Sequence, residues 1–156
     1  MKISLRIYTL FLAALFTSCT PANSEQTSIS SSSEHTIPVN RQIIWTDCLN
    51  REETNYLVFF YSETCSHCHE IMGDVLEFST ENIIKIYFSD INKGGTKIPI
   101  ATNIDDTLGI SDINEFFIAG TPTIVEVNEA TVFANVAGKD ACLTFLNEQR
   151  LNNKNN

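Results

Sequence analysis

Two cysteines with two residues between them, Cys65 and Cys68, are the residues of this 156-residue chain best suited to chemistry. The thiolate form of cysteine attacks disulfides and binds metals, and nearby positive charge favours it. His67 lies between the two cysteines and can supply part or all of such a charge. We therefore expect a reversible dithiol–disulfide centre made of Cys65 and Cys68, with His67 as its third catalytic residue.

An apolar run precedes this motif and a helical pattern follows it. Val58 to Tyr61 is short, β-branched and aromatic, which is typical of a buried strand. From Ser66 onward the apolar residues suit one face of a helix: Ile71, Met72, Val75, Leu76 and Phe78. Cys65 should then lie at the strand-to-helix turn, where free N–H groups and the helix dipole lower the pKa of a thiol. Cys65 would attack a substrate disulfide, and Cys68 would resolve the mixed disulfide.

The sequence resembles the thioredoxin superfamily over about residues 43–151. The resemblance rests on the strand, the Cys65-Ser66-His67-Cys68 motif and the helix, followed by Gly120-Thr121-Pro122-Thr123. The resemblance implies an α/β thioredoxin-like sandwich, with a mixed central sheet and helices on both faces. It also implies a cis Thr121–Pro122 bond facing the cysteines, a peptide groove shaped by these two residues, and no cofactor. A histidine directly before the second cysteine is similar to the oxidising and isomerising branches, which slightly favours these activities over reduction.

Two positions depart from the family pattern. Thioredoxins and several relatives carry a buried acid six residues before the first cysteine, and this chain has Phe59 there. A proton relay through that carboxylate is therefore in doubt. The aromatic residue often found directly before the first cysteine is Thr64 here.

The same motif allows three other interpretations. Cys65-x-x-Cys68-His69 matches the pattern for covalent haem c, although Met72 is too close to be a distal ligand and the Thr-Pro-Thr element would be unexplained. Structural zinc needs four ligands, for which these cysteines and histidines are poorly spaced, so we expect no metal. The third alternative is a non-catalytic thioredoxin-like binding module whose cysteines are only structural.

The N-terminus predicts export. Residues 1–18 have a basic start and an apolar run, as an export signal does, and are too short to count as a membrane span. Cys19 follows in a context that resembles a bacterial lipobox, where the cysteine is lipid-modified. We expect a lipoprotein on the extracytoplasmic side of the cell membrane. The alternatives are a soluble periplasmic or secreted protein and an uncleaved anchor.

The remaining chain divides into a tether, one domain and a tail. Residues 19–40 are rich in Ser and Thr and predict a lipid-anchored, disordered tether. Residues 41–151 form the predicted thioredoxin-like domain, and residues 152–156 a disordered tail. Within the domain we expect strands at 41–45, 58–61, 83–88, 123–128 and 131–136, helices at 46–53, 66–79, 111–117 and 139–151, and an irregular insertion at 91–109.

Cys48 and Cys142 lie near the two ends of the predicted domain. Without Cys19, the five cysteines become four, so these two could form a second, structural disulfide in an oxidising compartment. They could equally be two buried free thiols, because the sequence does not set the distance that a bridge requires.

Charge restricts the partners. Removal of the signal takes Lys2 and Arg6 from the 10 basic residues and none of the 19 acidic ones, which moves the formal net charge from −9 to −11. Such a surface argues against nucleic acid and against docking on anionic lipid. The expected partners are cysteine-containing protein substrates, a membrane redox partner that resets the disulfide, and the lipid bilayer through Cys19.

Overall fold

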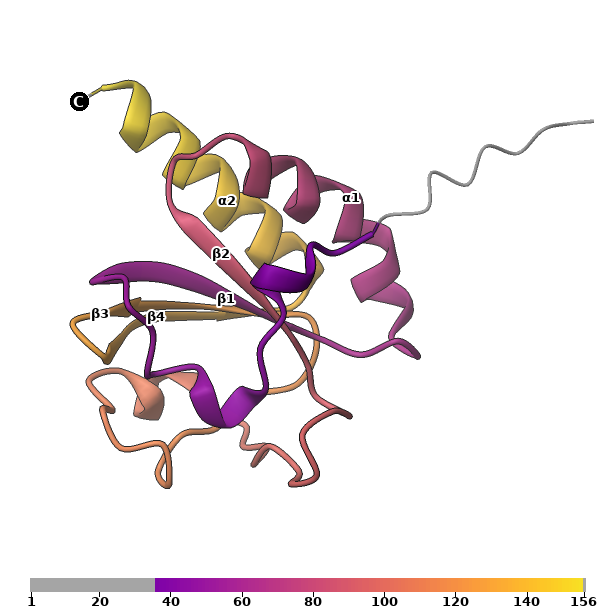
Figure 1. Cartoon of the computed structure of the whole chain (residues 1–156), viewed down its shortest axis with the longest axis vertical. Coiled ribbons are helices and arrows are strands. Elements are labelled where there is room, and N and C mark those ends of the chain that lie inside the picture. The colour runs from indigo at the N-terminus through magenta and orange to yellow at the C-terminus, as the bar shows by residue number, and fades with distance from the viewer. Residues whose placement is uncertain (1–35, 156) are drawn as a thin grey trace, which may run out of the picture. The chain divides into compact units, whose positions relative to one another are not determined.

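The computed structural model describes residues 36–155, and all element assignments refer to this part of the chain. The elements, shown in Figure 1, are η1 (Val39–Arg41), η2 (Trp45–Asp47), β1 (Asn55–Tyr61), α1 (Ser66–Thr80), β2 (Lys85–Asp90), η3 (Ile104–Thr107), β3 (Thr123–Asn128), β4 (Thr131–Ala137) and α2 (Lys139–Lys154), where η marks a 3-10 helix. The expected export signal, Cys19 and the tether up to residue 35 lie outside the described residues. Within the described range, no helix has the length and apolar character to cross a membrane.

The four strands form one mixed sheet in the order β2-β1-β3-β4. β1 and β2 are parallel and are connected through α1, whereas β3 is antiparallel to both of its neighbours, β1 and β4. β1 lies inside the sheet, and its residues from Tyr56 to Tyr61 are all buried. A strand covered on both faces needs no polar alternation, which explains the uninterrupted apolar run before the cysteines.

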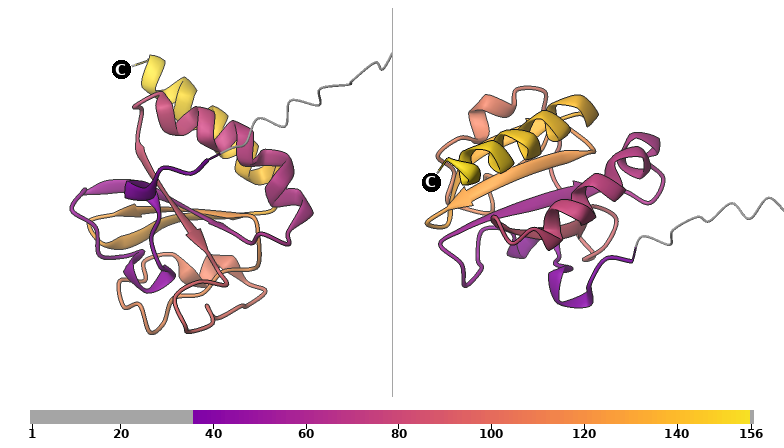
Figure 2. Two further views of the ribbon diagram at one scale, coloured as in Figure 1. Left: turned by 45° about the vertical axis from the view of Figure 1, so that its right-hand side comes forward. Right: turned by 90° about the horizontal axis from the view of Figure 1, so that it is seen from above.

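Each face of the sheet has its own hydrophobic cluster. α1 and α2 lie side by side over one face (Figure 2), where Phe59, Ile71 and Leu146 are buried. The other face is covered by η2, η3 and the irregular chain between β2 and β3, around the contact between Phe60 and Phe116. The predicted α/β class with a mixed central sheet is confirmed. Both α-helices share one face, and the helices over the other are short 3-10 helices.

The insertion at 91–109 is irregular as predicted, apart from η3. Its end is fastened to the edge strand β4, because the Gly109 N–H donates to the carbonyl of Val132 at 2.9 Å and the Val132 N–H donates to Ile110 at 2.9 Å. Beneath this contact, the side-chain amide of Asn135 donates to Thr107 Oγ1 at 2.9 Å. The segment thus completes the core and covers part of a strand edge that would otherwise be unpaired.

Two predicted elements near the start of the domain differ from the structure. The strand at 41–45 is a single bridge between Gln42 and Phe88, and the helix at 46–53 is only the turn η2. The Trp45 ring is buried and its Nε1–H donates to the carbonyl of Thr96 at 2.8 Å, so tertiary contacts hold this region in place of a regular element. Ile37 packs against the core beneath the helices, so the folded part begins before residue 41.

The helix predicted at 111–117 is wrong. Asp112 Oδ1 accepts the backbone N–H of Asn114 at 2.9 Å, which closes a side-chain turn where a helix would begin. Near the C-terminus the difference is the opposite, because α2 continues to Lys154 through most of the predicted tail. Its buried residues include Cys142 and Leu146 as predicted, but Ala141 is exposed.

Candidate active site

The Cys-x-x-Cys motif lies where the predicted strand meets the predicted helix. β1 ends at Tyr61, and a short turn follows in which the Cys65 N–H donates to the carbonyl of Ser62 at 3.1 Å. Cys65 is the N-cap of α1, in an extended conformation with φ −88° and ψ 110°. Cys68 lies in the first turn of the helix, so the predicted placement of both residues is confirmed.

Cys65 and Cys68 are joined by a disulfide, with their Cα atoms 5.2 Å apart. The two residues differ in accessibility, because Cys65 is partly exposed whereas Cys68 is 1% exposed. Cys65 is therefore open to solvent, whereas Cys68 is enclosed by the fold.

The N-terminus of α1 stabilises negative charge on the Cys65 sulfur. The Cys68 N–H donates to Cys65 Sγ at 3.1 Å, as a capping hydrogen bond. The first turn of this 15-residue helix contains no acidic residue that would oppose such a charge. A hydrogen bond to a charged acceptor is stronger than one to a neutral acceptor, and the helix dipole adds to it. The site thus favours the thiolate of Cys65 once the disulfide opens.

Thr121 and Pro122 face the disulfide, as the resemblance implied. The Thr121–Pro122 bond is cis, and the carbonyl oxygen of Thr121 lies 3.5 Å from Cys65 Sγ. Pro122 is buried, and its own carbonyl accepts the Gly138 N–H at 2.8 Å, which connects this loop to the end of β4. A disulfide sulfur carries no proton, so the Thr121 carbonyl can accept a hydrogen bond from Cys65 only when Cys65 is a thiol.

The structure brings His67 to the rim of the site without joining it to either sulfur. His67 is exposed, and none of the hydrogen bonds among the described residues links its ring to Cys65 or Cys68. Its charge acts on Glu70, whose pKa is lowered mainly by the hydrogen bond from Lys139 at 2.6 Å and to a smaller extent by His67. The effect of His67 on the thiolate therefore stays a prediction, because none of these hydrogen bonds carries it.

Phe59 is buried in the core beneath the helices, with 0% exposure. Its ring stacks with Tyr61 at a centroid distance of 5.9 Å and meets Phe88 edge to face. The position that carries an acid in thioredoxins is thus part of an aromatic cluster, and it supplies no proton acceptor to Cys68.

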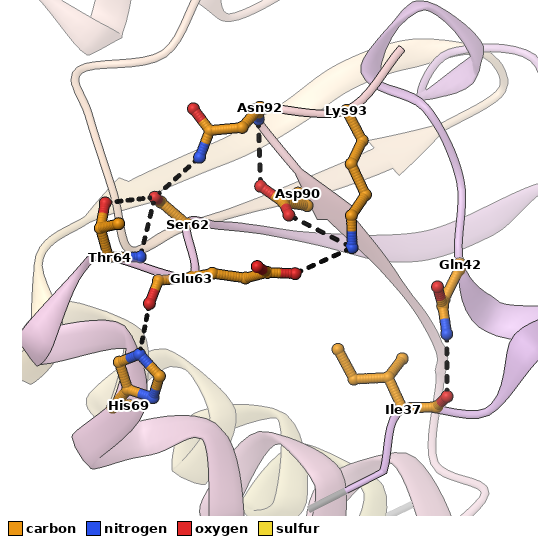
Figure 3. A network of polar contacts seen from close by, with 9 residues as sticks. All are labelled: Ile37, Gln42, Ser62, Glu63, Thr64, His69, Asp90, Asn92 and Lys93. Atoms are coloured by element: carbon orange, nitrogen blue, oxygen red, sulfur yellow. Dashed lines mark hydrogen bonds and ion pairs between the residues drawn. The ribbon is translucent and has the colours of Figure 1, made fainter.

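A polar network beside the disulfide was not predicted from the sequence. It joins the turn before Cys65 to the turn after β2 (Figure 3). Its members are Ser62, Glu63, Thr64, Asp90, Asn92 and Lys93. One signal for it was present in the sequence: Asp90 ends a strand parallel to β1 and Asn92 follows closely, and the carboxyl ends of parallel strands meet at one edge of the sheet.

A cavity of about 430 Å³ opens next to this network, and its lining includes Tyr61, Glu63, His69, Met72 and Lys93. A cavity of similar size, about 470 Å³, is lined by Glu81 and Arg150 at the other end of the helices. Its lining contains none of the residues of the polar network, whereas Glu63 and Lys93 line the first cavity. Only the first of the two therefore adjoins the network.

Cys48 and Cys142 are free and buried, so the second disulfide that we considered is not formed. They belong to different hydrophobic clusters, one on each face of the sheet, and the sheet separates them. Burial raises the pKa of both thiols, and that of Cys142 reaches about 12. Both cysteines are therefore core residues, which was the other alternative.

The geometry also bears on the haem and metal interpretations. Covalent haem c needs both sulfurs for thioether bonds, and here the sulfurs are bonded to each other. His69, the would-be axial ligand, has its Nε2 at 2.7 Å from the carbonyl oxygen of Glu63. Among the described residues, no group of three or more His, Cys, Asp or Glu side chains is placed to hold a metal ion.

No protein-family model matches this sequence, and a search of curated proteins finds no match. Similar solved structures include thioredoxin f2 from Chlamydomonas reinhardtii, with 19% identity over 69% of this chain and 93% of that one and a TM-score of 0.46. Thioredoxin O1 from Arabidopsis thaliana has 21% identity over 67% of this chain and 85% of that one, with a TM-score of 0.45. An uncharacterised thioredoxin-like protein from Clostridium perfringens has 19% identity over 80% and 90%, with a TM-score of 0.41. Values at this level do not establish a shared activity.

Proposed function

We propose that this protein exchanges thiols and disulfides with cysteine-containing proteins outside the cytoplasm. The observation that carries the proposal is the Cys65–Cys68 disulfide at the N-terminus of α1, where one cysteine is accessible and the other is buried. A purely structural disulfide gains nothing from this asymmetry. An exchange centre needs it, because one sulfur must meet the substrate while the other waits to displace it.

In the oxidising direction, a substrate thiolate attacks Cys65 Sγ and forms a mixed disulfide. The Cys65–Cys68 bond breaks, and Cys68 leaves with the electron pair as a thiolate. A second substrate thiolate attacks the substrate sulfur of the mixed disulfide, and Cys65 leaves as a thiolate held by the Cys68 N–H. The substrate gains a disulfide and loses two electrons to the pair, while the protons of its two thiols pass to solvent or to the reduced pair. The reverse sequence reduces a substrate.

Oxidation or isomerisation is favoured over reduction in this proposal. A dithiol whose reduced form is stabilised as a thiolate makes its disulfide a stronger oxidant. Two features support such stabilisation here: the N–H bond to Cys65 Sγ and an acid-free first turn. His67 is assigned the supporting role of a nearby positive charge. Thr121 and Pro122 shape the groove in which a substrate strand binds beside Cys65.

Export and anchoring complete the proposal, and they are supported by the sequence of residues 1–40. Cleavage before Cys19 and lipidation of this residue would tether the domain to the bilayer. The Ser- and Thr-rich segment would let it reach substrates at the cell surface. A membrane redox partner would then reset the Cys65–Cys68 pair after each exchange.

Substitution of the two cysteines tests the proposal. Cys68→Ala should accumulate mixed disulfides with other proteins at Cys65, because the Cys68 thiolate that displaces a bound substrate from Cys65 is missing. Cys65→Ala should form none, because Cys68 is buried. The adducts are counted by non-reducing electrophoresis and mass spectrometry of membranes from cells that express each variant. If the Cys68 variant cleared its adducts as fast as the unsubstituted protein, the assigned roles would be wrong.

A further inference from the structure

Ser62 is the hub of the polar network beside the disulfide. Its hydroxyl oxygen lies 2.9 Å from Asn92 Nδ2, 3.3 Å from the Thr64 backbone nitrogen and 3.0 Å from Thr64 Oγ1 (Figure 3). Its carbonyl accepts the Cys65 N–H at 3.1 Å. Ser62 thus shapes the turn that presents Cys65 with both its side chain and its backbone.

The direction of these hydrogen bonds follows from the chemistry of a hydroxyl group. An oxygen of this kind has two lone pairs and one hydrogen. The Asn92 side-chain nitrogen and the Thr64 backbone N–H can only donate, so they occupy both lone pairs of Ser62 Oγ. Its hydrogen is therefore donated to Thr64 Oγ1. Both lone pairs and the hydrogen of the Ser62 hydroxyl are thus used, and Ser62 is only 7% exposed.

A buried carboxylate holds the backbone of Asn92 in place. Its backbone N–H donates to Asp90 Oδ1 at 3.0 Å, and Asp90 is 4% exposed. Lys93 connects the same two turns a second time, with its Nζ 3.4 Å from Asp90 and 3.0 Å from Glu63. The Lys93 and Glu63 side chains are 57% and 69% exposed, so their ion pair contributes little. Asn92 is exposed as well, but its partner Ser62 is only 7% exposed, so the Asn92–Ser62 hydrogen bond connects the two turns at a buried hydroxyl group.

We propose that Asn92 is a positioning residue of the redox centre, which acts through Ser62 on the turn that carries Cys65. This inference rests on the proposed exchange activity. The capping bond from the Cys68 N–H to Cys65 Sγ depends on where the turn places the sulfur. When Asn92 is replaced by alanine, one lone pair of Ser62 Oγ lacks its hydrogen-bond donor, and the turn relaxes toward another donor. The thiolate of Cys65 then spends less time within reach of the helix N-terminus.

The chain contains a matched control for this test. Asp112-Ile113-Asn114 repeats the Asp90-Ile91-Asn92 triplet, and the Asn114 N–H donates to Asp112 Oδ1 at 2.9 Å. The Asn114 side chain donates to Asp112 Oδ1, in its own turn, and reaches no residue of the active site. Asn114→Ala therefore removes the same type of side chain from a turn of the same kind, at a site that has no contact with Ser62.

The experiment compares the mature chain (Cys19→Ser, to leave it unlipidated) with Asn92→Ala, Asn114→Ala, Ser62→Ala and the Ser62/Asn92 double variant. Two quantities are measured: the equilibrium constant of the Cys65–Cys68 pair with glutathione, and the pH profile of Cys65 alkylation in the reduced protein. Thermal unfolding of the oxidised forms verifies that each variant is folded.

We expect Asn92→Ala to make the disulfide about 3- to 10-fold less oxidising, the size of one hydrogen bond, and to move the alkylation midpoint to higher pH. Asn114→Ala should stay within about twofold of the unsubstituted protein. The double variant should match Ser62→Ala, because Asn92 acts through Ser62.

Two results would overturn the inference alone: Asn92→Ala that behaves like Asn114→Ala in both measurements, or additive effects of the Ser62 and Asn92 substitutions. An unsubstituted protein that does not exchange with glutathione would overturn the proposed function and this inference with it. The outcomes are therefore distinguishable.

Discussion

Mild reduction of the native protein should expose one reactive thiol out of four. With Cys19→Ser, the cysteines that remain are Cys48, Cys65, Cys68 and Cys142. Reduction opens only the Cys65–Cys68 bond, because the other two thiols are already free. Cys65 is partly exposed, whereas each of the other three is at most 1% exposed. A short pulse of iodoacetamide should therefore label Cys65 first.

The structure sets the size of the difference. Burial raises the pKa of Cys142 to about 12. At pH 8 its thiolate fraction is about a thousandfold smaller than that of an ordinary thiol, since each pKa unit is a factor of ten. Lack of access adds to this effect, because a fully buried sulfur reacts only when the chain opens locally or globally. Cys65 should thus react at least about a thousandfold faster than Cys142.

The assay is a time course of alkylation at pH 8, followed by peptide mass spectrometry. A sample unfolded in urea is the control, and in it all four thiols should react at similar rates. If Cys142 or Cys48 were labelled at a rate within about tenfold of that of Cys65 in the folded protein, the predicted difference in reactivity would be wrong. It would mean that the buried thiols are accessible, and that Cys65 is not distinguished by its place in the fold.

Two further predictions concern carboxyl groups whose ionisation affects stability in opposite directions. Burial raises the pKa of Glu53, but hydrogen bonds from Lys85 and Tyr87 outweigh it and lower the pKa to about 2. The ionised Glu53 therefore contributes stability above pH 4.5 that is lost as the pH falls toward 2. Glu53→Gln should lower the free energy of unfolding at pH 7 by about 1 kcal/mol, after allowance for screening by solvent. Urea titrations at different pH should also show a weaker acid dependence in this variant. Burial raises the pKa of Glu126, so its ionisation opposes folding, and this cost is absent at low pH and grows as the pH rises past the unfolded pKa of the group. Glu126→Gln should increase the free energy of unfolding at pH 7, by about 1 kcal/mol at most. A decrease in this variant would contradict the interpretation of Glu126, and an unchanged acid dependence in Glu53→Gln would contradict that of Glu53.

Much of the fold could be predicted because its signals are local. The run from Val58 to Tyr61 and the helical spacing after Ser66 are short-range patterns, and both elements form where expected. The strands β3 and β4 also form where expected, and the two residues between them, Glu129 and Ala130, adopt positive φ angles of 49° and 59°, which suit a two-residue turn between twisted strands.

The errors and omissions depend on contacts between distant residues or on competing side chains. Asp112 takes the N–H of Asn114, so a segment with a helical pattern forms a turn. The Asn92–Ser62 bond joins residues 30 positions apart, and it exists only because the ends of β1 and β2 meet at one edge of the sheet. The sequence could not show that Cys48 and Cys142 lie on opposite faces of the sheet, since the face that each occupies depends on the path of the whole chain.

The reduction potential of the Cys65–Cys68 pair tests the central claim most directly. The mature chain is equilibrated in glutathione buffers of defined ratio, and the reduced fraction is read from the mass of the alkylated protein. We expect a reversible two-electron transition, with a potential nearer to the value of about −120 mV of strong oxidants than to the value of about −270 mV of thioredoxin. A pair that stayed oxidised below about −300 mV, as structural disulfides do, would contradict the claim that this disulfide is a centre of exchange.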